Sequence, residues 1–112
     1  VTLQPQWRAV MLAGFKGVTA EQAGTARGAF IGFPLGQHPV AGKTGTAQVT
    51  GKQATSVFTS FAPADDPTYV VDAFLEQAGY GAESAAPVVR RIYEGLFGMT
   101  PASSVTTSGG ID

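Results

Sequence analysis

Apolar side chains recur at helical spacing close to the N-terminus of the chain. They fall three or four residues apart, at Leu3, Trp7, Val10, Met11, Gly14 and Phe15. An apolar stripe of this period predicts an amphipathic helix over residues 4–17 that packs against a core. Gly17 is the expected end of this helix. Gly24-Thr25-Ala26 predicts a short second helical turn that the hydroxyl of Thr25 caps.

Three later segments are rich in β-branched and aromatic residues, which favour β-strands. They span residues 40–50, 55–61 and 69–75. Turn signals at positions 51–52 and 63–67 join them, and links this short permit only antiparallel neighbours. We therefore expect a three-stranded antiparallel sheet. Asp65 and Asp66 are expected to be turn residues, not a pair of catalytic carboxylates.

A second amphipathic pattern follows the glycines at positions 79 and 81. Ser84 is its expected N-cap, Pro87 falls in the first turn, where a missing N–H is harmless, and Gly98 ends the helix. The apolar positions are Val88, Val89, Ile92, Tyr93, Leu96 and Phe97, and the charged positions expected in solvent are Arg90, Arg91 and Glu94. We expect Trp7 and Tyr93 to be core or helix-contact residues.

These elements predict an α+β fold with three antiparallel strands, flanked by an N-terminal and a C-terminal helix. The folded part is expected to occupy residues 1–98. Residues 99–112, rich in Ser, Thr and Gly, are expected to form a flexible tail. The helix-covered face of the sheet looks too large for two helices, so we expect additional elements on that face.

Composition excludes several classes of function. The 112 residues carry 7 Lys and Arg against 8 Asp and Glu, so the chain lacks the basic surface that nucleic-acid binding requires. The absence of Cys and the single His exclude thiol catalysis, disulfides and zinc sites built from Cys or several His, and we expect no metal and no cofactor. His38, next to Pro39, is expected to be a surface or strand-entry residue and not a general base. No apolar run reaches the ~20 residues of a membrane span.

The segment with chemical content is Lys43-Thr44-Gly45-Thr46. A lysine supplies a positive charge and can orient or transfer a proton, and two threonine hydroxyls can hydrogen-bond a carboxylate. The glycine between them lets an extended peptide lie against the strand without a β-carbon in the way. Strand alternation alone puts Lys43 and Thr44 on opposite faces. An exposed strand with an incidental cation fits the same four residues, so the wider sequence has to decide.

Residues 40–48 resemble the third signature of the serine D,D-transpeptidases, the penicillin-binding proteins, in which Lys-Thr-Gly accompanies Ser-x-x-Lys and Ser-x-Asn motifs. Gly24-Thr25-Ala26, the hairpin segment 60–67 and residues 85–89 are similar to class B members of this family. The resemblance extends over about residues 1–98. It implies an incomplete portion of the fold that penicillin-binding proteins share with serine β-lactamases.

The resemblance also implies a role for each residue of the motif. Lys43 would set the electrostatics and the proton relay around the nucleophile. The family implies that Lys43 and Thr44 nevertheless converge on one groove, helped by the twist of the strand at the rim of the sheet. The hydroxyls of Thr44 and Thr46 would bind the carboxylate of a D-Ala-D-Ala stem peptide or of a β-lactam, and the N–H of Thr46 would donate to the oxyanion. Gly45 would admit the peptide, and Gln48 would line the groove.

The two other motifs of the family are missing from this sequence. The residues three positions before Lys16, Lys43 and Lys52 are Ala13, Val40 and Val49, and the chain contains no Asn. We therefore expect the C-terminal part of a transpeptidase domain, inactive alone, that packs against a companion segment carrying the nucleophilic Ser. The family further implies an upstream membrane anchor and a place on the extracytoplasmic face of the bacterial membrane.

Three other functions fit the same motif. A serine β-lactamase shares the Lys-Thr-Gly strand but hydrolyses its acyl-enzyme, although the residues around Gln48 and Pro87 look less like that group. A β-lactam sensor or another non-catalytic relative would bind without turnover. A small interaction module that merely resembles this half-domain is the third alternative.

Overall fold

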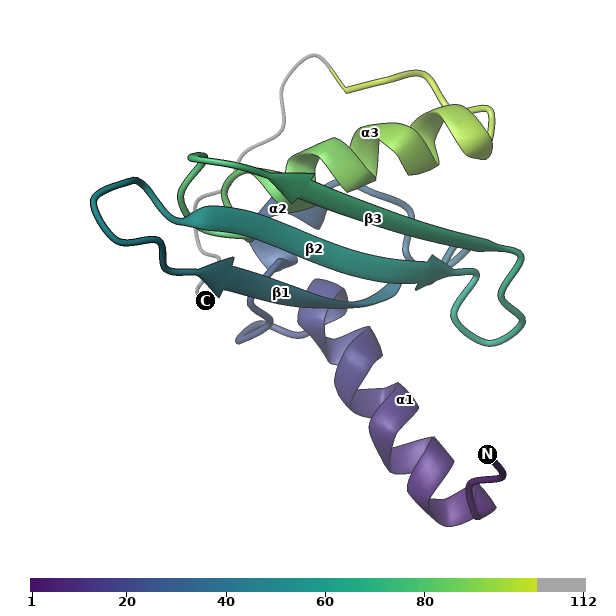
Figure 1. Ribbon diagram of the computed structural model, residues 1–112. Coiled ribbons are helices and arrows are strands. Elements are labelled where there is room, and N and C mark those ends of the chain that lie inside the picture. Colours follow the sequence, from purple (N-terminus) through teal and green to yellow (C-terminus); the bar gives the residue numbers. More distant parts are fainter. Residues whose placement is uncertain (103–112) are drawn as a thin grey trace.

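The computed structural model describes residues 1–102, and Figure 1 shows the arrangement of its elements. The elements are α1 (Pro5–Ala20), α2 (Arg27–Phe30), β1 (Ala41–Ala47), β2 (Thr55–Ala62), β3 (Tyr69–Leu75) and α3 (Ala85–Leu96). The predicted α+β class is confirmed. The third strand has its predicted bounds, whereas β1 ends at Ala47 and not at position 50.

The sheet has the order β1-β2-β3, and both neighbouring pairs are antiparallel. Because side chains alternate along a strand, the sheet has two distinct faces. The α3 face, which α3 and α2 cover, carries the buried residues Ser56, Phe58, Ser60 and Ala62 of β2. The opposite face carries Val57, Thr59 and Phe61 of β2 and Val70, Asp72 and Phe74 of β3.

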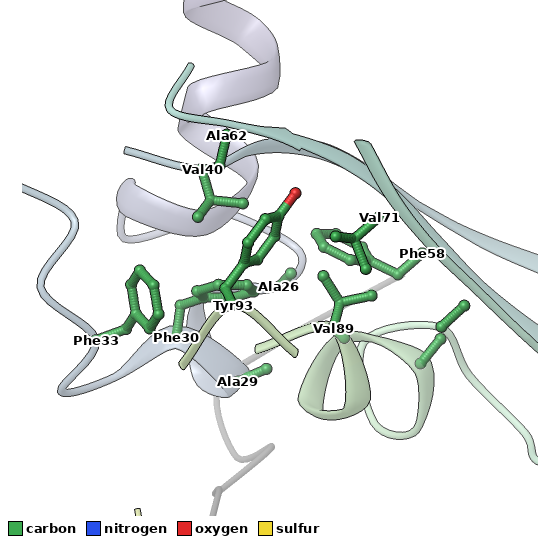
Figure 2. Packing of buried hydrophobic residues seen from close by; sticks show 13 residues of the cluster. Ala26, Ala29, Phe30, Phe33, Val40, Phe58, Ala62, Val71, Val89 and Tyr93 are labelled. Atoms are coloured by element: carbon green, nitrogen blue, oxygen red, sulfur yellow. The ribbon is translucent and has the colours of Figure 1, made fainter. Parts of the chain in front are cut away.

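The core lies between the α3 face and the helices that cover it (Figure 2). Phe58 of β2 meets Phe30 of α2 with ring centroids 6.1 Å apart, and Tyr93 of α3 is fully buried. The phenol oxygen of Tyr93 lies 2.9 Å from Oγ of Ser60, which donates to the main-chain oxygen of Val71 at 2.8 Å. The buried hydroxyls are thereby hydrogen-bonded. The prediction that Tyr93 is a core residue is confirmed.

Contrary to the expectation that both lie in solvent, Glu94 is buried and so is Arg90. Its Nε donates to Oε1 of Glu94 at 2.8 Å, and only 7% and 3% of the two side chains is exposed. Its Nη1 donates to the main-chain oxygens of Ala29 and Ile31, which otherwise end α2 without helical partners. The buried face of α3 is therefore rotated relative to the predicted one. The apolar residues that this rotation leaves exposed are Val88, Ile92 and Leu96.

Helix α1 is longer than predicted and largely exposed. It continues through Gly17 to Ala20, so Gly17 does not end it. The predicted core stripe is wrong for the described chain, because Leu3, Trp7, Val10 and Met11 are 46%, 61%, 67% and 47% exposed. Thr19 holds the last turn: it is 1% exposed, and its hydroxyl donates to the main-chain oxygen of Val40 at 2.7 Å. The rest of the helix projects away from the sheet (Figure 1).

The predicted cap at Thr25 is wrong, and the predicted cap at Ser84 is right in its position but makes no capping hydrogen bond. The N-cap of α2 is Ala26, and the hydroxyl of Thr25 bonds to Thr44 instead. Ser84 does occupy the N-cap position of α3, but its hydroxyl donates to the main-chain oxygen of Ala78 at 2.6 Å. In both cases a tertiary contact replaces the local one.

The expectation of further elements on the helix-covered face is also wrong, because α2 and α3 already bury it. The most exposed apolar side chains of the sheet lie on the opposite face, where Val70 is 76% and Phe74 is 62% exposed. At the C-terminal end, Ala102 is hydrogen-bonded to Arg91 and Glu94 of α3. Residues 103–112 of the predicted flexible tail lie outside the described residues, so the tail stays a prediction.

Candidate functional site

The Lys-Thr-Gly-Thr motif lies in β1, at one edge of the sheet (Figure 1). Within residues 1–102, β1 pairs with β2 and with no second strand. Thr44 lies opposite Phe58 and shares the α3 face with Thr46, whereas Lys43 and Gly45 belong to the opposite face. The side chains of Lys43 and Thr44 are thus separated, as strand alternation predicts.

Lys43 is exposed but does not extend into solvent. Its Nζ donates to the main-chain oxygen of Thr44 at 2.6 Å, so the ammonium group lies against the strand. Main-chain groups of residues two positions apart in a strand point to the same side. The N–H of Thr46 therefore points to the same side of β1 as the carbonyl group of Thr44, which accepts the hydrogen bond from Lys43. A positive charge and a main-chain donor on one side of a strand favour an anion there.

Thr44 is 5% exposed, and its hydroxyl has a partner from the segment before α2. The Oγ1 atoms of Thr44 and Thr25 lie 2.9 Å apart. Thr46 is half-buried, and the N–H of Gly81 donates to its Oγ1 at 3.4 Å. Neither Thr25 nor Gly81 was recognised from the sequence as a neighbour of the motif. The sequence does contain a glycine in each of these segments, Gly24 and Gly81. In the structure a β-carbon at either position would clash with neighbouring main-chain atoms, so these glycines mark places where two segments pack closely.

Gly45 differs from other glycines near the motif. A β-carbon at Gly45 would meet Cβ of Val57 at 3.5 Å, an ordinary van der Waals contact. At Gly42 it would stand 2.6 Å from the ring of Phe58, so the packing of the chain itself requires that glycine. Nothing in the described part of the chain requires Gly45, and the space beside it opens on the opposite face.

Three other residues were singled out from the sequence. Gln48 is exposed just beyond the end of β1. His38 is half-buried and stacks on Phe97 with ring centroids 4.2 Å apart, so it makes a packing contact. Asp65, in the turn after β2, forms an exposed ion pair with Lys16 at 3.1 Å.

A cavity of about 250 Å³ lies between the end of α1 and the loop before β1, and the motif does not line it. Across residues 1–102, no three potential His, Cys, Asp or Glu ligands gather at one point that could hold a metal ion. In the same region, each helix is too short or too polar to cross a bilayer.

Comparison with known proteins covers most of this region. Residues 5–94 match the family model described as penicillin binding protein transpeptidase domain. The chain is 34% identical over 103 residues to peptidoglycan D,D-transpeptidase MrdA of Haemophilus influenzae, covering 79% of this chain and 15% of that protein. It is 35% identical over 85 residues to a peptidoglycan D,D-transpeptidase FtsI homolog of Chlorokybus atmophyticus, covering 65% of this chain and 12% of that protein. The chain thus spans a small part of the length of these relatives.

A solved structure gives the same result for the fold. The crystal structure of Pseudomonas aeruginosa PBP2 in complex with WCK 5153 matches 91% of this chain and 22% of that chain, with a TM-score of 0.75 and 30% sequence identity. The resemblance on residues 40–48 is therefore part of a match in sequence and in fold that extends over nearly all the described elements. The chain belongs to the penicillin-binding protein transpeptidase family, among its class B members.

Proposed function

We propose that this chain supplies the substrate-binding strand of a peptidoglycan D,D-transpeptidase whose nucleophilic serine lies on a companion segment. In that reaction the serine oxygen attacks the carbonyl of the D-Ala-D-Ala bond, and the terminal D-Ala leaves. The acyl group then passes to the amine of a neighbouring stem peptide. Membership of the family supports this activity for the complete enzyme. The absence of Ser-x-x-Lys and of Asn from the chain supports the division of labour between two segments.

In this proposal the edge of β1 binds the substrate terminus as an extended peptide. The ammonium group of Lys43 supplies positive charge beside the nucleophile and takes part in the proton relay. The hydroxyls of Thr44 and Thr46 bind the terminal carboxylate of the peptide or of a β-lactam. The N–H of Thr46 donates to the oxyanion, and Gln48 lines the outer end of the groove. Losing one oxyanion donor typically costs about 3 kcal/mol of transition-state stabilisation.

One observation carries the proposal further than the family match does: the space beside Gly45. Gly45 lies in the middle of an edge strand, and no neighbouring atom of the described chain requires a glycine there. A peptide therefore has room to approach the main chain of this strand. The glycines at positions 24, 42 and 81 contrast with it, because a β-carbon at each would clash with the chain's own atoms. A glycine at position 45 is therefore better explained by a contact with a bound peptide than by packing within the chain.

The companion segment is proposed to cover the opposite face of the sheet. Phe61 on that face and the apolar side of α1 enclose a groove of about 170 Å³, lined by Leu3, Arg8, Met11, Leu12, Phe15 and Phe61. Val70, which pairs with Phe61 in the sheet register, is exposed. Contiguous apolar surface of this kind is typical of an interaction site. The assembled enzyme would lie on the extracytoplasmic face of the bacterial membrane, held by an upstream anchor.

A fluorescent penicillin tests the proposal directly. The complete domain, comprising this chain and the companion segment, should be labelled covalently and should release the label slowly. The 112-residue chain alone should stay unlabelled. Rapid release with hydrolysed penicillin would identify a β-lactamase, and covalent labelling of the isolated chain would contradict the assignment of the nucleophile to the companion.

A further inference from the structure

We infer that Thr25 is a positioning residue for Thr44, holding its hydroxyl in the orientation that receives the carboxylate of the substrate. The inference rests on the proposed function, because it assigns a partner to one residue of the proposed binding strand. The two Oγ1 atoms are 2.9 Å apart, and Thr44 is 5% exposed. The hydroxyl of Thr44 has one proton, so its orientation decides whether it can donate to a carboxylate.

Thr25 is itself held rigidly by both of its neighbours in sequence. A β-carbon on Gly24 would stand 2.3 Å from the main-chain oxygen of Gly17, so this glycine packs directly on the last turns of α1. On the other side, Ala26 is fully buried, and its N–H donates to the main-chain oxygen of Val18 at 2.9 Å. The end of α1 therefore fixes the position from which Thr25 reaches β1.

The hydroxyl of Thr25 has no local function that would explain it. The N-cap of α2 is Ala26, and no side chain makes a capping hydrogen bond there. The contact with Thr44 is thus the role that the described structure gives this hydroxyl. Gly24-Thr25-Ala26 is the segment for which the sequence predicted a cap, and its geometry points to the substrate strand instead.

The direction of the hydrogen bonds follows from the chemistry of the ligand. A carboxylate accepts hydrogen bonds, so Thr44 must donate its only hydroxyl proton to it. Thr25 must then donate to Oγ1 of Thr44, and a chain runs from Thr25 through Thr44 to the carboxylate. Each bond in such a chain polarises the next and strengthens the one that reaches the anion. Without Thr25, the hydroxyl of Thr44 loses both its fixed orientation and this polarisation.

The test compares Thr25→Val, which removes the hydroxyl, with Thr25→Ser, which keeps it, in the complete transpeptidase domain that contains this chain. The second-order acylation rate is measured with a penicillin that has a free carboxylate and with its methyl ester. Thr25→Val should lower the rate for the free acid about tenfold, near the upper end of what one hydrogen bond between neutral groups contributes. The rate for the ester should change less than about twofold, and Thr25→Ser should restore most of the loss.

Thr19→Val is the matched structural control. Thr19 is a buried threonine in the last turn of α1, and its hydroxyl bonds to the main-chain oxygen of Val40, just before β1, instead of to the motif. This variant should unfold at a lower temperature and keep the wild-type ratio of acid to ester rates. If Thr25→Val does not fold, Thr25→Ala gives the same comparison, because Thr25 is only half-buried.

Two results would overturn the inference alone, provided that the wild-type domain is acylated normally. In the first, Thr25→Val lowers the acylation rate by the same factor for the free acid and for the ester. In the second, Thr25→Ser is acylated as slowly as Thr25→Val. A wild-type domain that no penicillin acylates would overturn the proposed function, and the role of Thr25 with it. The two failures are therefore distinguishable.

Discussion

The backbones of Gly81 and Gly45 touch across the α3 face of the sheet: a β-carbon on Gly81 would stand 2.6 Å from the main-chain oxygen of Gly45 and 3.0 Å from its nitrogen. The loop that carries Gly81 is anchored from β2, since Oγ of Ser56 donates to the main-chain oxygen of Tyr80 at 2.9 Å. The same Oγ accepts from the N–H of Ala85 at 3.0 Å, at the start of α3. The motif strand therefore rests on a fixed support.

Gly81→Ala should weaken that support. The added β-carbon would also stand 2.4 Å from the main-chain oxygen of Val57, so β1 or the loop must shift. Overpacking of this kind typically costs about 1–3 kcal/mol of stability. Urea unfolding should show the loss, and acylation of the complete domain should slow in parallel. Gly36→Ala is the control, since a β-carbon there meets nothing within 4 Å. Equal stability of the two variants would show that the close approach of Gly81 to β1 does not contribute to stability.

Removing the charge of Lys43 should separate function from stability. The side chain is exposed, and its hydrogen bond goes to the adjacent main-chain oxygen of Thr44, so Lys43→Met should leave the unfolding free energy within about 0.5 kcal/mol. If Lys43 serves the proton relay, acylation by a fluorescent penicillin should fall at least about 100-fold. A variant that is labelled at the wild-type rate would remove Lys43 from the catalytic machinery.

The period of the apolar positions predicted the existence and type of the elements, but it predicted only in part which of their faces are buried. The apolar side chains of the stripe that contains Trp7 do lie along α1, but no element of the described chain covers them. In α3, both faces contain residues able to pack. Val89 and Tyr93 are buried as the pattern predicts, and Arg90 is buried beside them, where it donates to the carbonyl groups of Ala29 and Ile31, far away in sequence. Such a choice depends on tertiary contacts that a local pattern does not contain.

The candidate site divides in the same way. Strand alternation correctly placed Lys43 and Thr44 on opposite faces, because it depends on local geometry alone. The contacts of Thr44 with Thr25 and of Thr46 with Gly81 depend on how two loops fold back onto β1. Thr25 looked like a helix cap because threonine is a common cap, and only its tertiary partner distinguishes the two roles.

Tyr93 should give the stability a distinct dependence on alkaline pH. Its burial raises the pKa of the phenol above the ordinary value of 10.0. The folded state therefore keeps the proton at pH values where the unfolded chain has lost it. This contribution to stability is fully present below about pH 10 and is lost as the pH rises towards the folded pKa. Urea unfolding should show that stability falls more steeply above pH 10 in the wild type than in Tyr93→Phe; parallel curves would contradict this.

Gly45→Ala provides the sharpest separation of substrate binding from folding. The new β-carbon makes only an ordinary contact with Val57 at 3.5 Å, and alanine loses less conformational freedom than glycine, so stability should be unchanged or higher by up to about 1 kcal/mol. On the open side it would displace a peptide that approaches the strand, and a displacement of about 1 Å can cost 100-fold in rate. Acylation should therefore fall at least about tenfold while the urea midpoint holds. Gly42→Ala, whose β-carbon would stand 2.6 Å from the ring of Phe58, should show a lower midpoint instead. If Gly45→Ala is acylated as fast as the wild type, the space beside Gly45 is not where the substrate lies.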